Sequence, residues 1–181
     1  MKVPNLNRSG LESGRASLTL RGIAFSLGLL TSLGVLAAEV GEKAPSFSIV
    51  SLTSNETVSL DDFKGKVVIL DFWASWCGPC LVAMPKLSAL SDSLPNDKAA
   101  LLAISVDSDP RRAKRFMTKM GATYDSLIDP EGDVAGIYDL PGMPTTFVID
   151  QEGKITAQLV GFTPGDEDKL LRDVATLYDN D

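Results

Sequence analysis

Histidine is absent from this chain of 181 residues. Hydrolases that use a serine–histidine or cysteine–histidine pair, enzymes with a histidine general base and the common histidine-containing metal sites all require an imidazole. The sequence therefore excludes these classes. Cysteine is scarce as well, because the chain has only Cys77 and Cys80, which lie too close together in sequence to brace distant parts of a fold. The formal net charge of −7 excludes a nucleic-acid binder.

The two cysteines enclose a glycine and a proline, in the sequence CGPC, directly after the apolar run at residues 67–73. A C-x-x-C pair placed where a strand leads into a helix puts one sulfur at the helix N-terminus, where the helix dipole and free amide groups favour a thiolate. As a structural staple, the closure of so short a loop contributes only about 2 kcal/mol. A zinc site would need carboxylates to complete its tetrahedron. Thiol–disulfide exchange is the function that this pattern favours.

The first 38 residues predict an export segment. Basic residues precede the apolar stretch 22–38, and they are Lys2, Arg8, Arg15 and Arg21. Two alternatives stay open: a signal peptide cleaved after the small residues at positions 37 and 38, or an anchor in the inner membrane formed by residues 22–38, which reaches the lower end of the span range of about 17 to 25 residues. Both predict a periplasmic or otherwise extracytoplasmic location for the remainder. A buried helix of the folded domain is a third interpretation.

Residues 39–181 predict a single α/β domain with its own core. Alternating and continuous apolar runs predict strands at residues 47–52, 57–60, 67–72, 99–106, 124–128, 145–149 and 155–160. The first two form a hairpin around Ser54 and Asn55. Capping and turn residues predict helices after Pro79, from Pro110 to Gly121, from a start at residues 129–130 with a brief helix at 134–138, and after Pro164.

The expected helix after Asp109 is amphipathic. Its apolar residues recur at helical spacing and are Ala113, Phe116, Met117 and Met120. Its basic residues are Arg111, Arg112, Lys114, Arg115 and Lys119. We interpret the basic residues as a solvated helix face, with a docking patch for an acidic partner as the alternative.

The block DFWASWCGPC at residues 71–80, with Pro85 beyond it and Met143, Pro144 and Thr145 before a strand, resembles the thioredoxin superfamily. Within it, the chain is similar to the exported TlpA/ResA-type thiol–disulfide oxidoreductases. The similarity to that branch rests on the export segment, on the opening at residues 40–47 and on an insert of about 30 residues before Pro144. It implies a thioredoxin fold, with a central mixed sheet flanked by helices, an N-terminal β-hairpin and a cis-proline at Pro144.

The resemblance also implies roles for particular residues. Cys77 would be the exposed nucleophile that forms a mixed disulfide, and Cys80 the buried thiol that resolves it. Asp71 would be a buried acid with a raised pKa that takes the Cys80 proton. Without the resemblance, an exposed acid at a strand end is an equal interpretation of Asp71. Substrate contacts would come from the residues around the cysteines and the cis-proline, namely Trp76, Gly78, Pro79, Met143 and Pro144.

The sequence departs from the family at three positions near the cysteines. Ala83 stands where a glutamate often follows the second cysteine, and Leu81 and approximately Ala103 stand where cytoplasmic thioredoxins have lysines. The charged groups near the thiols therefore differ from those in these related proteins. Of the two tryptophans, Trp73 is expected in the core and Trp76 at the surface.

Together these observations predict an exported protein-disulfide reductase that needs no cofactor and works as a monomer. A membrane thiol donor of the CcdA/DsbD type would supply electrons, and the clients would be apocytochrome c, copper-centre assembly proteins or misoxidised proteins. The reductase direction follows from the Gly78–Pro79 pair, which matches thioredoxin and not the oxidant DsbA. The alternatives are an oxidase or isomerase of disulfide formation, a peroxiredoxin-like antioxidant, and a binding module that only retains the fold.

Overall fold

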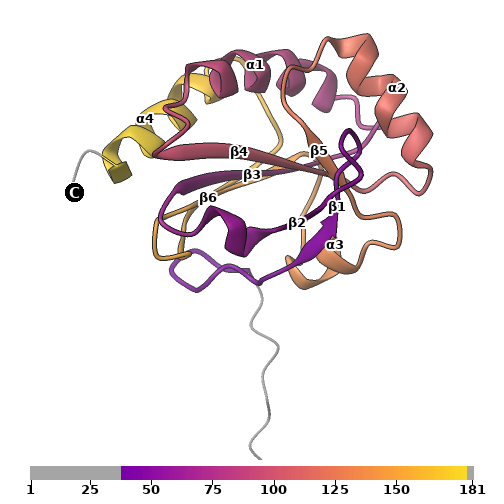
Figure 1. The fold of residues 1–181 in the computed structure, drawn as a ribbon. Helices are drawn as coiled ribbons and strands as arrows, with labels where there is room; N and C mark the ends of the chain where they lie inside the picture. Colours follow the sequence, from indigo (N-terminus) through magenta and orange to yellow (C-terminus); the bar gives the residue numbers. More distant parts are fainter. Residues whose placement is uncertain (1–37, 179–181) are drawn as a thin grey trace, which may run out of the picture. The chain divides into compact units, whose positions relative to one another are not determined.

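The computed structural model describes residues 38–178. The expected export segment at residues 1–38 lies, except for Ala38, outside the described residues. The described part is built on a five-stranded sheet of order β5-β4-β3-β6-β7 with a separate two-stranded hairpin (Figure 1). In chain order the elements are β1 Ser48–Val50, β2 Thr57–Ser59, the 3₁₀ turn η1 Leu60–Phe63, β3 Val67–Trp73, α1 Cys80–Ser93, β4 Ala99–Ser105, α2 Pro110–Met120, β5 Ser126–Ile128, α3 Asp133–Ile137, β6 Thr145–Ile149, β7 Ile155–Val160 and α4 Asp166–Tyr178.

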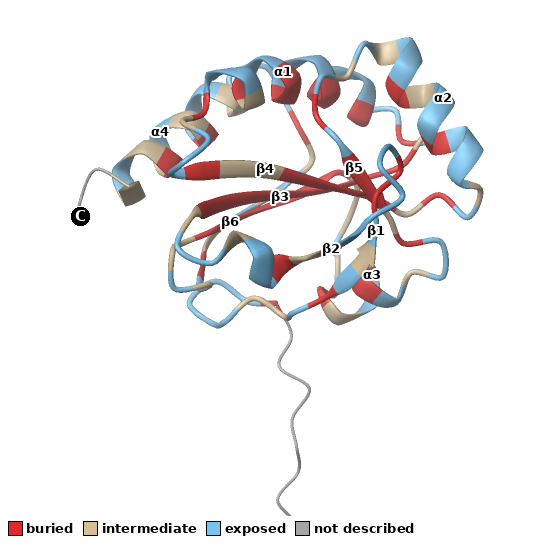
Figure 2. Ribbon diagram, in the orientation of Figure 1, coloured by how far each residue is buried: buried red, intermediate tan, exposed pale blue. Residues whose placement is uncertain are grey.

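The sheet is mixed. β3 pairs in parallel with β4, and β4 with β5, whereas β6 runs antiparallel to both β3 and β7. All seven residues of β3 are buried, as Figure 2 shows for the centre of the sheet. A strand covered on both faces reads as a continuous apolar run, which explains the pattern at residues 67–73. The expected thioredoxin-like fold, with a mixed central sheet flanked by helices, is confirmed.

Side chains of β3 alternate between two buried clusters. Those of Ile69 and Trp73 enter the cluster on the side of α1, α2 and α4, here called the helix-side cluster, which also contains Cys80, Met84, Leu87, Ala103, Met117, Tyr124, Val148, Leu170 and Val174. Those of Leu70 and Phe72 enter the opposite cluster, with Phe47, Leu60, Val134, Tyr138 and Phe147. In Figure 1, α1, α2 and α4 accordingly cover one face of the sheet and α3 lies on the other.

Most predicted elements are present, with three main differences. The hairpin is shorter than predicted, because β1 and β2 span three residues each. The strand predicted at residues 124–128 begins only at Ser126. The brief third helix begins at Asp133 and not at residues 129–130, since Gly132 adopts a left-handed turn with φ of 77°. The Asp129 carboxylate instead accepts a hydrogen bond of 2.8 Å from the Ala135 amide, inside that helix. The insert before Pro144 folds as β5 and α3.

The amphipathic helix α2 is confirmed. Ala113 and Met117 are buried in the helix-side cluster, and Phe116 and Met120 pack against it. Arg111 pairs with Asp109 at 3.1 Å on the exposed side. Docking of a partner on the basic residues stays a prediction. Within residues 38–178, no helix has both the length and the apolar character needed to cross a membrane.

Candidate active site

The two cysteines lie at the carboxyl end of the central strand. β3 ends at Trp73, a loop of six residues that includes Cys77 follows, and α1 begins at Cys80. Cys77 and Cys80 form a disulfide with their Cα atoms 5.4 Å apart, so the structure shows the oxidised form of the pair. The strand-to-helix placement expected from the sequence is therefore confirmed.

The Cys77 sulfur takes the place of a capping side chain at the start of α1. Its Sγ accepts a hydrogen bond of 3.2 Å from the Cys80 amide, and the N-cap residue Pro79 offers no side-chain cap. The first turn of α1 contains no acidic residue. The Cys80 amide and the positive end of the helix dipole therefore act on this sulfur, and both stabilise a thiolate.

The expectation that Cys77 is exposed is wrong for this oxidised form. Cys77 is 5% exposed and Cys80 is 1% exposed, so both are buried. The physical reason is that the bond to the Cys80 sulfur and the contact with the Cys80 amide cover much of the Cys77 side chain. Gly78 and Pro79, between the two cysteines, are exposed. Cys77 is still more exposed than Cys80, as the predicted roles of nucleophile and buried resolving thiol require.

The loop before Cys77 is held by Asp107, which lies between β4 and α2. The cap of α2 is Asp109. The Asp107 carboxylate instead accepts hydrogen bonds of 2.8 Å from the Ser75 amide and 2.7 Å from the Ser75 hydroxyl. Asp107 is thereby a positioning residue for the segment that carries Trp76 and Cys77. No sequence pattern indicated this contact, because the two residues come from different strand ends.

Asp71 lies in the middle of β3 and is buried, with 2% of its surface exposed. The alternative of an exposed acid at a strand end is therefore wrong. Its side chain shares a face with Ile69 and Trp73, and so points toward the side of the sheet where Cys80 is buried. The Thr146 hydroxyl donates to its Oδ1 at 2.7 Å. Burial raises the pKa of Asp71 to about 7, and the Thr146 hydrogen bond partly opposes this rise.

The Met143–Pro144 bond is cis, as expected. Thr145 pairs with Phe72, so Pro144 lies at the same end of the sheet as the cysteines. Pro144 is buried and accepts a hydrogen bond from the Gly161 amide at 2.8 Å. Met143 is half-buried, and its backbone forms no hydrogen bond within residues 38–178. A free backbone segment beside a disulfide can pair with an extended peptide.

Apolar side chains at the surface gather on the chain segments around the disulfide. Trp76 is 62% exposed, whereas Trp73 is buried, as expected for both. The other large apolar residues exposed on segments at this end of the sheet are Leu81, Val82 and Val160. Single exposed apolar residues need no explanation, but several close to a reactive pair indicate a contact surface.

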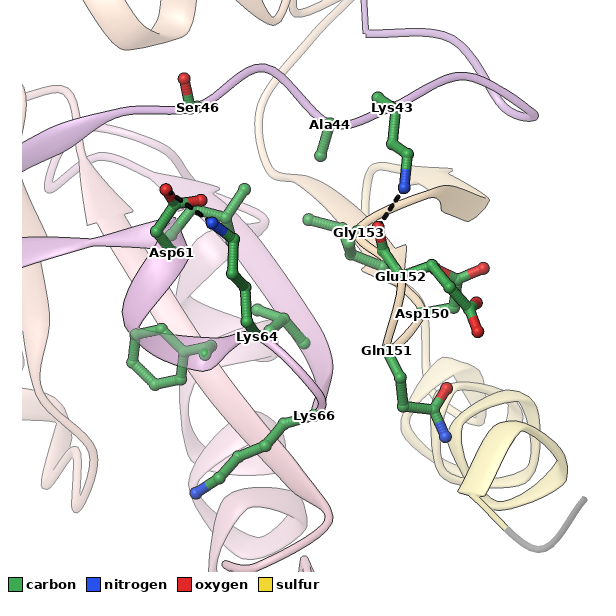
Figure 3. Close-up of a pocket in the computed structure, with 14 residues that line it drawn as sticks. Lys43, Ala44, Ser46, Asp61, Lys64, Lys66, Asp150, Gln151, Glu152 and Gly153 are labelled. Carbon is green, nitrogen blue, oxygen red and sulfur yellow. Dashed lines mark hydrogen bonds and ion pairs between the residues drawn. The ribbon is translucent and has the colours of Figure 1, made fainter. Parts of the chain in front are cut away.

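A pocket of about 240 Å³ lies at the opposite end of β3 (Figure 3). It contains three lysines, each with an acceptor: Lys43 donates to the Glu152 carbonyl, Lys64 pairs with Asp61 at 2.9 Å, and Lys66 donates to the Asn96 carbonyl at 2.6 Å. Because each of these ammonium groups already has an acceptor within the protein, we assign the pocket no function. Within residues 38–178, no group of three thiol or carboxylate side chains is placed to hold a metal ion.

The sequence matches the AhpC/TSA family over residues 40–158. The chain belongs to this family. Within this thioredoxin-like family it is 32% identical, over 123 residues, to the thiol-disulfide oxidoreductase ResA of Bacillus thuringiensis, an alignment that covers 68% of this chain and 70% of ResA.

Two solved structures are also similar. One, from Chlorobium tepidum and described as thiol:disulfide interchange protein DsbE, has a TM-score of 0.73 and 34% identity and covers 78% of this chain and 99% of its own. The other is a secreted thiol-disulfide isomerase from Corynebacterium glutamicum, with a TM-score of 0.67 and 26% identity. The match covers 75% of this chain and 85% of the isomerase. This AhpC/TSA-family chain is accordingly a thiol–disulfide oxidoreductase of the ResA and DsbE type, with Cys77 and Cys80 as its pair.

Proposed function

We propose that this protein is an extracytoplasmic reductase of protein disulfides. The observation that carries the proposal is the uncharged setting of the Cys77 sulfur. The helix N-terminus favours its thiolate, but Gly78 and Pro79 add no charged group, and the residues after Cys80 in the first turn of α1 are Leu81, Val82 and Ala83. Strong oxidants such as DsbA owe their potential to a stabilised reduced form. A thiolate supported by helix amides alone gives a more reducing pair.

The reaction is a transfer of two electrons to the partner. The Cys77 thiolate attacks one sulfur of the partner disulfide and displaces the other as a thiolate. Cys80 then loses its proton to Asp71 and attacks the Cys77 sulfur. This attack forms the Cys77–Cys80 bond of the described structure and breaks the mixed disulfide. The two partner sulfurs leave as thiolates, which take up one proton from Asp71 and one from solvent to give the dithiol. A thiol donor of the CcdA/DsbD type would reduce that bond again.

Two features support a protein substrate and an extracytoplasmic setting. The free backbone of Met143 and the exposed Trp76 lie where an extended chain can approach the cysteines. The predicted export segment and the secreted relative from Corynebacterium glutamicum support the location. The client, the choice between signal peptide and anchor, and the monomeric state stay predictions.

A trapping experiment with two serine variants tests the proposal. Cys80→Ser should accumulate a mixed disulfide with a disulfide-bonded substrate such as insulin, because the resolving thiol is missing. The matched variant Cys77→Ser should neither trap nor reduce it. Trapping by Cys77→Ser, or none by Cys80→Ser, would contradict the assigned order.

The reduction potential against glutathione tests the direction. We expect a value nearer to that of thioredoxin, about −270 mV, than to that of DsbA, about −120 mV. A value near the latter would make the protein an oxidase. Consumption of hydrogen peroxide by Cys80→Ser at the rate of the wild type would instead identify a peroxiredoxin-like activity.

Asp71→Asn tests the proton acceptor. Asparagine cannot take the Cys80 proton, so resolution of the preformed mixed disulfide should slow by about 100-fold at pH 7, the lower end of the usual range for loss of a general base. Stopped-flow release of the partner thiol measures this step. Unaltered release, with the fold confirmed by circular dichroism, would remove Asp71 from the mechanism.

A further inference from the structure

The Tyr124 hydroxyl is buried inside the domain without a protein partner. Tyr124 precedes β5 and is 8% exposed, and its oxygen forms no hydrogen bond within residues 38–178. The other tyrosine buried in the described core differs in this respect, since the Tyr138 hydroxyl donates to the Pro45 carbonyl at 2.8 Å. A buried hydroxyl that lacks a partner costs about 1–3 kcal/mol, so such groups are usually bonded to protein or to an ordered water.

The unpartnered hydroxyl lies within electrostatic reach of Asp71. The Tyr124 ring belongs to the helix-side cluster, together with Cys80 and Ala103. Burial raises the pKa of Tyr124, and the negative charge of Asp71 raises it further. The two groups therefore interact electrostatically, although no direct hydrogen bond joins them.

The neighbouring strands supply the Asp71 carboxyl with a single side-chain donor. Thr146, Asp71, Ala103 and Ser126 are successive partners across β6, β3, β4 and β5, so their side chains share one face. Thr146 donates to one carboxylate oxygen. On the other side of Asp71, Ala103 ends at its Cβ, and the Ser126 hydroxyl is occupied by Trp73 and the Leu127 carbonyl. The strands therefore supply no second donor to Asp71.

The other groups around Asp71 are uncharged or are the reacting thiol. Cys80 is the titratable group that α1 contributes to the helix-side cluster, and α4 contributes Leu170 and Val174. Within the described residues, burial and the Thr146 hydrogen bond shift the pKa of Asp71, and no charged neighbour contributes to this shift. Tyr124 belongs to the same cluster, and its hydroxyl is a buried polar group that still lacks a partner.

We propose that a buried water bridges the Tyr124 hydroxyl and the second carboxylate oxygen of Asp71, and that Tyr124 is thereby a positioning residue for proton transfer from Cys80. This inference rests on the proposed role of Asp71. The Tyr124 hydroxyl donates to the water, and the water donates to Asp71, so each polar group gains a partner. The proton of Cys80 still passes to the carboxylate, and Tyr124 neither gains nor loses one.

The test compares Tyr124→Phe with Tyr138→Phe in the full-length protein. Both variants remove only a hydroxyl from a buried ring, but Tyr138 lies in the opposite cluster. A donor to the carboxylate favours its charged form, so its loss in Tyr124→Phe should raise the Asp71 midpoint by about 0.5 to 1 pH unit. Carbon-13 NMR of the carboxyl in the reduced protein measures this midpoint without reference to activity. Tyr138→Phe should leave it unchanged.

The kinetic consequence is a shifted pH profile. Release of the partner from the mixed disulfide should slow about two- to five-fold at pH 6.5 in Tyr124→Phe and recover above pH 8.5, since more of Asp71 is protonated at the lower pH. Adding Asp71→Asn should abolish the difference between tyrosine and phenylalanine, because the two residues act through one carboxyl.

An Asp71 midpoint in Tyr124→Phe that coincides with the wild type would overturn the water bridge, and so would an equal shift in Tyr138→Phe. Failure of the proposed mechanism gives a different result: Asp71→Asn would then release the partner at the wild-type rate, while the NMR midpoint still reports whether Tyr124 acts on Asp71.

Discussion

At the scale of single residues, Asp71 is a source of instability at neutral pH. Burial raises its pKa from 3.8 to about 7, so the folded protein binds a proton more tightly than the unfolded chain does. Stability from this group is complete below the unfolded pKa and falls as the pH rises from about 4 through 7, because ionisation then favours the unfolded state. A carboxyl kept in such a place indicates a role other than stabilisation.

Asp71→Asn should therefore stabilise the protein at pH 8. We expect an increase in the free energy of unfolding of about 2–4 kcal/mol, which disappears near pH 4 where the native carboxyl is protonated. Urea denaturation of the oxidised protein at both pH values measures the change. Thr146→Val should act in the opposite direction at pH 8, since it removes the hydroxyl that supports the charged carboxylate. Equal destabilisation of both variants at pH 8 would contradict this account.

At the scale of elements, α2 shows how local signals end a helix and how tertiary contacts place it. Asp109 caps its first turn through the Arg111 amide, and Gly121 closes it in the left-handed conformation with φ of 65°. The Trp73 ring stacks on Phe116 of this helix at 5.5 Å between centroids and donates to the Ser126 hydroxyl at 2.9 Å. The last residue of β3 is thereby fixed to α2 and β5, directly before the loop that carries Cys77.

Two glycine substitutions separate backbone strain from packing. A Cβ added at Gly121 or at Gly136 meets no atom within 4 Å, but only Gly121 of the two has a positive φ. Gly121→Ala should therefore lower the free energy of unfolding by about 1 kcal/mol, through the left-handed backbone alone. Gly136→Ala, inside α3, should be neutral or stabilising by up to about 1 kcal/mol. Thermal and urea unfolding provide the comparison, and a larger loss at Gly136 would refute it.

At the scale of the whole molecule, two buried clusters on the faces of one sheet hold the domain together. Three of the four ion pairs within residues 38–178 lie at the surface, where each contributes little. The fourth joins Lys86 of α1 to the half-buried Glu167 of α4 at 2.8 Å. The disulfide closes a loop of four residues and therefore constrains the unfolded chain weakly. The domain can thus change its redox state without losing its fold, as an electron carrier must.

Reduction of Cys77–Cys80 should leave the domain folded. We expect the free energy of unfolding to change by about 2 kcal/mol or less, the entropy of so short a loop. Circular dichroism in the far and near ultraviolet, before and after dithiothreitol, follows the fold, and urea titration gives the energy. Loss of the near-ultraviolet signal on reduction would show that the disulfide has a structural role.

Some features of the fold and the site follow from the sequence and others do not, for physical reasons. Strands β6 and β7 were predicted to the residue, because runs rich in β-branched and apolar residues end at turn residues such as Gly153. The start of α3 was misplaced, since Asp129 caps from outside the helix. The burial of Cys77 was missed, because it depends on the bonded state of the sulfur. The hydrogen bonds from Ser75 to the Asp107 carboxylate were not predicted, since the two residues are 32 positions apart in the sequence.

The sequence alone determined the chemistry of this protein: a CGPC pair between a buried strand and a helix, and the absence of every imidazole. Local spacing is sufficient there, because a helix N-terminus acts on the sulfur that lies next to it in the chain. Only the tertiary structure decided how Asp71 is tuned. Its neighbours Thr146 and Ala103 come from two separate strands, and burial and register, which no linear pattern records, bring them to one carboxyl.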